Sequence, residues 1–305
     1  MKLNKLFIVL FALTFLFFVG CDEDDDINEF EVLVEYLEGD DGGYVNNLGT
    51  WIFTEASVNL DDYLVLDLRS ATDFDATPNP IADAVNTTLS GMWALAEAAT
   101  EPILVTCYSG QTASFAHTLL RLKGYEAYTM KFGMSWHDVT LDKWTVKCVD
   151  TYAGDLVTTA SPTLPSFDYP ELNTGEEDGA AILDARIDAA IAAWGAGLLV
   201  SAETVMNEPA SYNIINYWVE ADYLDHGHID GSYQVTPSTL TMDENLSVFD
   251  PIGGNIFYCY TGQTAAASIA YLTVLGYDVK SIAYGFNNMN WSELPGHKWS
   301  KPYSG

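Results

Sequence analysis

The chain has 305 residues, 49% of them hydrophobic and 13% aromatic, a composition that excludes a disordered protein and provides enough apolar residues for two domains. It carries 43 acidic against 12 basic side chains, a formal net charge of −31. This balance argues against binding to nucleic acid or to an anionic membrane surface, because both select Lys and Arg. It also repels anionic substrates at long range, so an anion site is expected to rely on local N–H donors.

The first residues are typical of a targeting segment. Two lysines give a basic start, a largely apolar run covers residues 6–19, and a small residue precedes Cys21. The apolar run is too short for a typical membrane span, and a small residue before a cysteine suits a bacterial lipoprotein signal. We therefore expect a signal peptide at residues 1–20, a lipid on Cys21 that inserts into a bilayer, an acidic tether at residues 21–27, and a location on the bacterial cell envelope. An ordinary secretory signal or an uncleaved anchor is the alternative.

The rest of the chain is predicted to form two domains, at residues 28–157 and 179–305, joined by a Pro-containing linker at residues 158–178. Short apolar runs, typical of buried parallel strands, alternate with helical stretches in both halves. The expected strands include residues 64–66, 103–105, 198–200 and 256–257, and the expected helices include residues 29–37, 113–122, 182–194 and 265–275. This alternation predicts an α/β fold in which each half has a central parallel sheet flanked by helices.

One short loop occurs twice, each time between an expected strand and an expected helix. Residues 107–113 read Cys-Tyr-Ser-Gly-Gln-Thr-Ala, and residues 259–265 read Cys-Tyr-Thr-Gly-Gln-Thr-Ala. A cysteine placed before a Gly-containing turn and a helix can have its sulfur surrounded by backbone N–H groups. We expect these groups and the helix dipole to lower the pKa of Cys107 and Cys259, which makes both thiolates nucleophiles. A buried, unreactive cysteine is the alternative.

The other side chains of the two loops have different expected roles. Gly110 and Gly262 permit the turn, while Gln111 and Gln263 either donate amide hydrogens at the mouth of the site or face solvent. The tyrosines are expected to shape the rim, and the threonines to offer hydroxyl donors without charge. The loop residues are Tyr108, Ser109, Gly110, Gln111, Thr112 and Ala113 in the first copy, and Tyr260, Thr261, Gly262, Gln263, Thr264 and Ala265 in the second.

Cys148, the tryptophans and the histidines are not expected to take part in the chemistry of the loops. Cys148 has no counterpart in the second copy, so we expect it to have a packing role. The tryptophans at positions 136, 144, 291 and 299 are expected in the core or between the domains. The histidines share no spacing that suggests a metal site, and no cofactor is expected.

In the order of these motifs the chain resembles the rhodanese family of bacterial sulfurtransferases in a tandem arrangement. Asp67-Leu-Arg69 precedes the first loop, a Gly-His-Ile turn at His228 precedes the second, and Gly-Tyr follows both. The resemblance implies that Cys107 and Cys259 take sulfane sulfur from thiosulfate, a polysulfide or a persulfide and pass it, as a cysteine persulfide, to a thiol or cyanide. We expect Asp67 and Arg69 to form a structural ion pair near the loop, and His228 to stabilise a turn.

The chain also departs from the pattern of this family. Many members have Arg or Lys at the sixth loop position, where Thr112 and Thr264 stand here, so we expect weak attraction for thiosulfate and a neutral or thiol-linked donor. Asn216 and Trp218 replace the Asp-x-Arg motif in the second copy. These losses favour an alternative function, a non-catalytic rhodanese-like lipoprotein that binds a protein partner in an outer-membrane or electron-transfer assembly. A cysteine-dependent phosphatase is a weaker alternative because no Arg is present in the loop to hold a dianion.

Overall fold

The computed structural model describes residues 27–39, 45–294 and 296–300. The predicted signal peptide, the lipid site at Cys21 and nearly all of the acidic tether lie outside the described residues. Within the part that the structure describes, no helix combines the length and the apolar character needed to cross a membrane.

Two five-stranded sheets form the framework, and all of their strand pairs are parallel. The first sheet has the order β1-β5-β4-β2-β3 and the second the order β10-β8-β11-β12-β7. The first comprises β1 (Ile52–Phe53), β2 (Leu64–Asp67), β3 (Val85–Asn86), β4 (Ile103–Thr106) and β5 (Ala127–Met130). The second comprises β7 (Leu199–Val200), β8 (Asn213–Asn216), β10 (Tyr233–Gln234), β11 (Asn255–Tyr258) and β12 (Val279–Ile282). The predicted α/β fold with a parallel sheet in each half is therefore confirmed.

Helices flank both sheets, which explains why the central strands carry no polar face. Every residue of β4 and β11 is buried, as expected for parallel strands covered on both sides. The helices of the first half are α2 (Ala71–Asp75), α3 (Met92–Ala98), α4 (Gln111–Leu122) and α5 (Met134–His137). Those of the second half are α6 (Gly179–Gly197), α7 (Ala202–Asn207), α8 (Glu220–Asp225) and α9 (Gln263–Val274).

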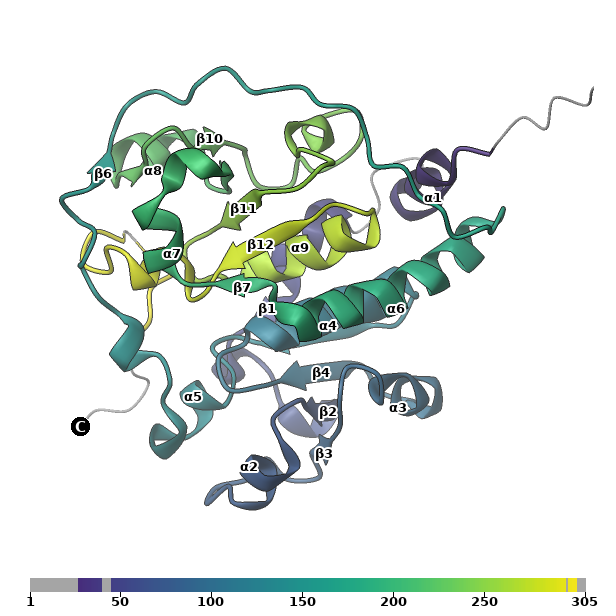
Figure 1. Cartoon of the computed structure of the whole chain (residues 1–305). Coiled ribbons are helices and arrows are strands. Elements are labelled where there is room, and N and C mark those ends of the chain that lie inside the picture. The colour runs from purple at the N-terminus through teal and green to yellow at the C-terminus, as the bar shows by residue number, and fades with distance from the viewer. Residues whose placement is uncertain (1–26, 40–44, 295, 301–305) are drawn as a thin grey trace, which may run out of the picture.

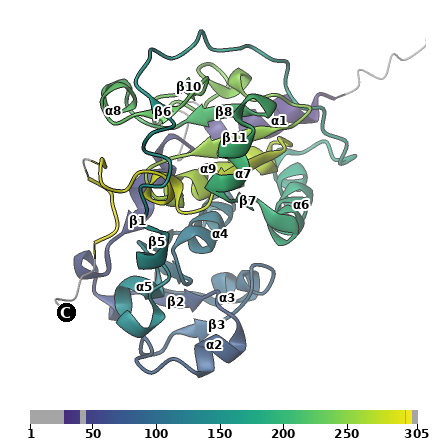
Figure 2. The same cartoon turned by 60° about the vertical axis from the view of Figure 1, so that its left-hand side comes forward.

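The two helices that follow the repeated loops, α4 and α9, pack against each other between the sheets (Figures 1 and 2). Nearly all of their residues are buried, which is typical of helices enclosed on every side. Because both helices begin at the carboxyl end of a central strand, this packing brings the two cysteine loops to a common interface.

The N-terminal helix α1 (Glu29–Glu38) packs on the second half of the chain, although it precedes the first sheet in sequence. The Phe30 ring stacks on Tyr169, with ring centroids 4.9 Å apart, and meets the edge of Tyr277 at 6.3 Å. The Glu38 carboxylate accepts a hydrogen bond from the Tyr271 hydroxyl at 2.8 Å. The first described helix thus adds to the core around α6 and α9 before the chain crosses to the first sheet.

The predicted linker, residues 158–178, contains neither helix nor strand and runs over the surface of the second half (Figure 1). It is held there by hydrogen bonds, among them one from the Phe167 N–H to the Ser247 carbonyl at 2.8 Å and one from the Tyr169 hydroxyl to the Met242 carbonyl at 3.3 Å. Just before it, β6 (Leu156–Val157) pairs antiparallel with β9 (His228–Ile229), so the end of the first half is tied to the second.

His117 on α4 should make the protein less stable in acid. It is fully buried, its Nδ1 lies 2.7 Å from the Thr129 hydroxyl, and burial lowers its pKa from 6.5 to about 3. At a pH between these two pKa values, the unfolded chain binds a proton at His117 and the folded chain does not. The free energy of unfolding therefore falls by about 1.4 kcal/mol per pH unit as the pH drops. Urea unfolding between pH 7 and pH 4 should show a shallower pH dependence for His117→Gln than for the natural protein.

The matched control is His226→Gln, which removes a histidine that is only partly buried. This variant tests whether the loss of any one histidine is enough to make the pH dependence shallower. If His117→Gln and the natural protein lost stability in parallel, the assignment of the acid effect to His117 would be wrong.

Candidate functional site

Cys107 directly follows β4 and opens the loop that leads into α4. Gly110 has a φ of +83°, a left-handed conformation that suits glycine, and its N–H donates to the Cys107 Sγ at 3.2 Å. The backbone amides of Ser109, Thr112 and Ala113 also face the sulfur. The predicted ring of N–H groups around the first sulfur is present.

Cys259 repeats this arrangement between β11 and α9. Gly262 has a φ of +71°, and the N–H of Ala265 donates to the Cys259 Sγ at 3.3 Å. The amides of Thr261, Gly262 and Thr264 complete the ring. Converging N–H groups of this kind form an anion-binding nest, which suits a thiolate or a persulfide anion.

The predicted lowering of the thiol pKa values is wrong. Cys107 is 5% exposed and Cys259 is 2% exposed, and burial raises the pKa of both thiols above the ordinary value of 9.0. Loss of hydration penalises the thiolate more than the surrounding amides stabilise it. Both cysteines are therefore held mainly as thiols at neutral pH, in a setting where the amides limit the cost of ionisation.

Neither loop glutamine faces solvent, so that alternative is wrong, whereas Gln263 does line the cavity beside Cys259. Each is 1% exposed and reaches into the other half of the chain. The Gln263 Oε1 accepts from the Phe132 N–H at 2.7 Å, and the Gln111 Oε1 accepts from the Tyr284 N–H at 2.8 Å. These two hydrogen bonds join the loop of each half to a segment of the opposite half: the segment after β5 for Gln263, and the segment after β12 for Gln111.

The two loops lie in direct contact through these glutamines. An alanine Cβ built at Gly110 would lie 2.2 Å from the Gln263 Oε1, and one at Gly262 would lie 2.8 Å from the Gln111 Oε1. Each loop glycine thus serves two purposes, since it permits the turn and leaves room for the glutamine of the other half.

Cys259 lines a cavity of about 470 Å³, a size that suits a small ligand. Residues of both halves form its walls. From the second half come Tyr217, Asp222, Tyr260, Gln263, Thr264 and His297, and from the first half Asn46, Leu48, Gly49, Thr50, Ile52 and Lys131. Sequence analysis missed the contribution of the first half because no local pattern indicates which distant segment closes a site.

The tyrosine after each cysteine packs as a wall and keeps its proton. The Tyr260 hydroxyl donates to the Asp222 Oδ2 at 2.5 Å, and its ring stacks on Trp218 with centroids 4.6 Å apart. In the first half the Arg69 guanidinium lies 5.3 Å from the centroid of the Tyr108 ring. Burial raises the pKa of both phenols, which makes them poor acids or bases at neutral pH.

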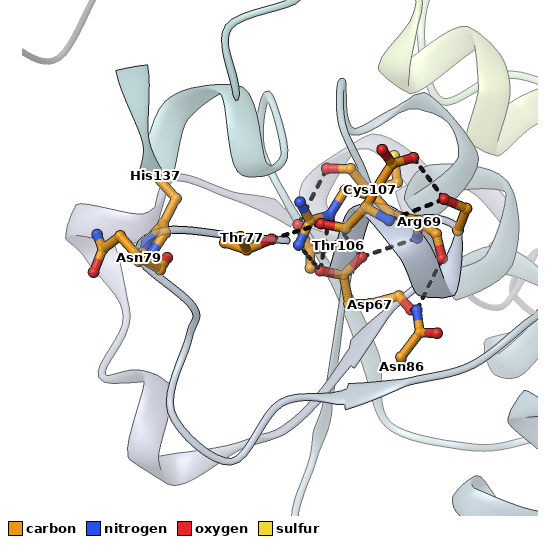
Figure 3. A network of polar contacts seen from close by, with 10 residues as sticks. Asp67, Arg69, Thr77, Asn79, Asn86, Thr106, Cys107 and His137 are labelled. Carbon is orange, nitrogen blue, oxygen red and sulfur yellow. Dashed lines mark hydrogen bonds and ion pairs between the residues drawn. The ribbon is translucent and has the colours of Figure 1, made fainter. Parts of the chain in front are cut away.

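Asp67 and Arg69 form the ion pair predicted for them (Figure 3). The Arg69 guanidinium donates to the Asp67 Oδ2 at 2.6 Å, and the two side chains are 1% and 2% exposed. The Asn86 amide donates to the backbone carbonyls of both residues, at 2.9 and 2.8 Å. The pair thus fixes the end of β2 beside Cys107.

Asp67→Asn should destabilise the protein by about 3–5 kcal/mol, because it leaves the buried Arg69 charge without its carboxylate. The second half supplies a matched control, since Asn216 and Trp218 occupy the corresponding positions there. The double variant Asp67→Asn with Arg69→Trp should recover part of the loss, as Trp218 already stacks on the tyrosine of its loop. Urea unfolding measures both, and a double variant less stable than Asp67→Asn alone would contradict this account.

His228 lies in β9 and is 1% exposed. Its Nδ1 lies 2.8 Å from the Tyr223 carbonyl, and its ring stacks on that of Tyr223 with centroids 3.4 Å apart. It lines no part of the cavity beside Cys259. These contacts fit the turn-stabilising role expected from the Gly-His-Ile motif.

An aromatic cluster covers the first loop where the two halves meet. Trp144 and Trp299 are buried with ring centroids 5.8 Å apart, and the indole N–H of Trp144 donates to the Ser109 carbonyl at 3.2 Å. Both tryptophans therefore take the core or interface position predicted for them. Cys148 is partly buried against this cluster, and Cys107, Cys148 and Cys259 are all free thiols.

No family model and no curated protein matches this chain. Similar solved structures include a rhodanese homologue from the extremely thermophilic bacterium Thermus thermophilus, which is 28% identical over 25% of this chain and 83% of its own, with a TM-score of 0.20. The thiosulfate sulfurtransferase from Pseudomonas aeruginosa is 16% identical over 91% of this chain and 49% of its own, with a TM-score of 0.28.

The 3-mercaptopyruvate sulfotransferase from Escherichia coli is 14% identical over 77% of this chain and 99% of its own, with a TM-score of 0.25. The chain thus spans about half the length of the Pseudomonas enzyme. These neighbours belong to the family that the motifs resemble.

Proposed function

We propose that the chain is a sulfurtransferase that carries sulfane sulfur as a persulfide on Cys259, with Cys107 competent for the same step. One observation supports this above all. The Cys259 sulfur accepts a hydrogen bond from the first turn of α9, faces further loop amides, and lines a cavity with room for a small donor. Amides arranged in this way stabilise negative charge on sulfur before and after transfer.

The proposed reaction has two steps that balance in atoms and charge. The Cys259 thiolate, formed by loss of its proton to solvent, attacks the outer sulfur of thiosulfate. The S–S bond of the donor breaks, sulfite leaves with the electron pair, and the cysteine becomes a persulfide anion. Cyanide then takes the outer sulfur as thiocyanate, or a thiolate takes it as a new persulfide, and the Cys259 thiolate returns.

Intact mass spectrometry tests this function directly. The purified chain, incubated with thiosulfate or with polysulfide, should gain one sulfur atom per working cysteine and lose it again on addition of cyanide. Cys259→Ser together with Cys107→Ser should prevent the gain, whereas Cys148→Ser should not. If neither donor added sulfur to the natural protein, the sulfurtransferase proposal would be wrong.

A non-catalytic binding role is the second candidate, and a specific observation favours it. Both thiols are nearly inaccessible, and burial raises the pKa of each. A protein partner in the cell envelope would then be bound by the surface of the fold and not through sulfur chemistry. The mass experiment separates the two, because this role requires no sulfur uptake.

We further propose that a lipid on Cys21 anchors the protein to a membrane of the bacterial envelope. The apolar run at residues 6–19 and the cysteine after it support this location. Cys21→Ala should move the protein from the membrane fraction to the soluble fraction. Unchanged fractionation, with no lipid mass on the natural chain, would contradict the anchor.

A further inference from the structure

The two cysteine sites differ in the residue that the opposite half presents to them. The Gln263 Oε1 holds the N–H of Phe132, so the preceding residue, Lys131, is fixed at the loop of Cys259. The Gln111 Oε1 holds the N–H of Tyr284 in the same way, but there the preceding residue is Ala283. The same backbone contact therefore places the ammonium group of Lys131 beside Cys259 and the methyl group of Ala283 beside Cys107.

Lys131 lines the cavity beside Cys259 and forms no ion pair among the described residues. Both residues line the cavity, and the Lys131 ammonium lies 5.2 Å from the centroid of the Phe132 ring. In the described part of the chain its ammonium has no side-chain hydrogen bond, and the one carboxylate lining the cavity, Asp222, is engaged by the Tyr260 hydroxyl and not by Lys131. In a chain with a net charge of −31, an unpaired and partly buried ammonium is a local attractor for anions.

A second donor of the cavity is also without a partner. The Gln263 Nε2 is buried and makes no hydrogen bond, although the carbonyl oxygen of the same amide is engaged by Phe132. A buried N–H group that lacks an acceptor costs free energy, which an anionic oxygen in the cavity would recover. The Thr264 side chain lines the same space and adds a hydroxyl.

We propose that the cavity beside Cys259 binds the anionic end of the sulfur donor, and that Lys131 from the first half is the residue that recognises it. The donor class is a small oxyanion that carries a sulfane sulfur, such as thiosulfate or an organic thiosulfonate. This inference rests on the proposed sulfurtransferase function and replaces the expectation of a neutral donor. Lys131 supplies, from the opposite half, the cation that the sixth loop position lacks, and it stabilises the negative charge that develops on the departing oxyanion.

The test compares an anionic with a neutral donor at the same cysteine. Reaction at Cys259 is followed by peptide mass spectrometry with thiosulfate, which adds one sulfur atom and releases sulfite, and with a neutral organic trisulfide, whose central sulfur is attacked to form a mixed trisulfide on Cys259 with release of a thiolate. Lys131→Met should lower the ratio of the thiosulfate rate to the trisulfide rate by about tenfold to a hundredfold, the worth of one hydrogen bond to a charged group. The ratio matters because a change in the ionisation of Cys259 alters both rates alike and cancels.

Two further variants make the result specific. Lys131→Arg keeps the charge and should retain most of the ratio. Lys280→Met removes a lysine on the exposed side of β12, outside the cavity, and should leave the ratio unchanged. If Lys280→Met lowered the ratio as much as Lys131→Met, the effect would be one of net charge and the assignment of Lys131 would fail.

The outcomes also separate this inference from the proposed function. Uptake from neither donor would overturn the sulfurtransferase proposal and this inference with it. Uptake from both donors, with a ratio that Lys131→Met does not change, would overturn the role of Lys131 and leave sulfur transfer standing. Should Lys131→Met fold poorly, Lys131→Gln provides the same loss of charge with a polar side chain.

Discussion

Gly285→Ala should reduce sulfur uptake at Cys259 by at least about a hundredfold, and uptake at Cys107, whose loop meets the neighbouring Tyr284 through Gln111, by much less. Gly285 has a φ of +55°, and an alanine Cβ there would lie 2.3 Å from the Cys259 carbonyl oxygen and 2.5 Å from the Gly262 nitrogen. These atoms belong to the loop that encircles the sulfur. They can move aside only by opening the ring of amides, so the substitution acts on the nest itself.

Gly133 is the corresponding glycine of the first half and allows the same experiment at Cys107. An alanine Cβ at Gly133 would lie 2.1 Å from the Cys107 carbonyl oxygen and 2.8 Å from the Gly110 nitrogen, so Gly133→Ala should reduce uptake at Cys107 far more than uptake at Cys259. Gly195→Ala on α6 meets no atom within 4 Å and should leave both sites active. Peptide mass spectrometry reads the two cysteines separately, and the less affected site reports that the variant is folded. Full uptake at Cys259 in Gly285→Ala would contradict the proposed nest.

The local part of the site could be predicted from the sequence because it depends on neighbours along the chain. The buried runs at β4 and β11, the helical stretches α4 and α9, and the turn at Gly110 and Gly262 each follow from a short pattern. The repetition of the loop adds to this, since packing alone does not require the same seven-residue pattern in both halves. The strand, the turn and the helix together place both sulfurs.

The remainder depends on contacts between distant segments, which no short pattern encodes. Phe132 and Gln263 are 131 positions apart, and their hydrogen bond exists only because α4 packs on α9. The same packing turns Lys131 toward Cys259. The sequence also does not show whether the pKa of the thiols is raised or lowered. This shift is the balance of two opposing effects, burial and amide hydrogen bonding, whose sizes depend on the folded structure.

Labelling of Cys259 by iodoacetamide, a small neutral reagent, should accelerate about tenfold for each pH unit between pH 7 and pH 9 without reaching a plateau. The thiolate is the form that reacts with iodoacetamide. Because burial raises the pKa of Cys259 above 9.0, the ionised fraction of the thiol still grows with every added unit of pH in this range. A plateau below pH 8 would show a thiol that is already ionised, and would contradict the dominance of burial over the amides.

Lys131→Met should shift this profile to higher pH, because the ammonium favours the thiolate that shares its cavity. At a fixed pH near 8 the variant should therefore be labelled more slowly at Cys259. Labelling of Cys107 is the internal control, since Ala283 occupies the corresponding position beside that loop and no charge is removed there. Equal shifts at both cysteines would contradict a local effect of Lys131.

With thiosulfate in place of iodoacetamide the profile should gain a descending limb. Attack requires the Cys259 thiolate, whereas binding of the oxyanion requires the Lys131 ammonium, and burial lowers the pKa of Lys131 below its ordinary 10.5. The rate should rise as the thiol ionises and then fall as the lysine loses its proton, which gives a bell-shaped profile with an alkaline optimum. Because iodoacetamide needs no cation, its rate should not fall, and the difference between the two profiles isolates the contribution of Lys131 to donor binding.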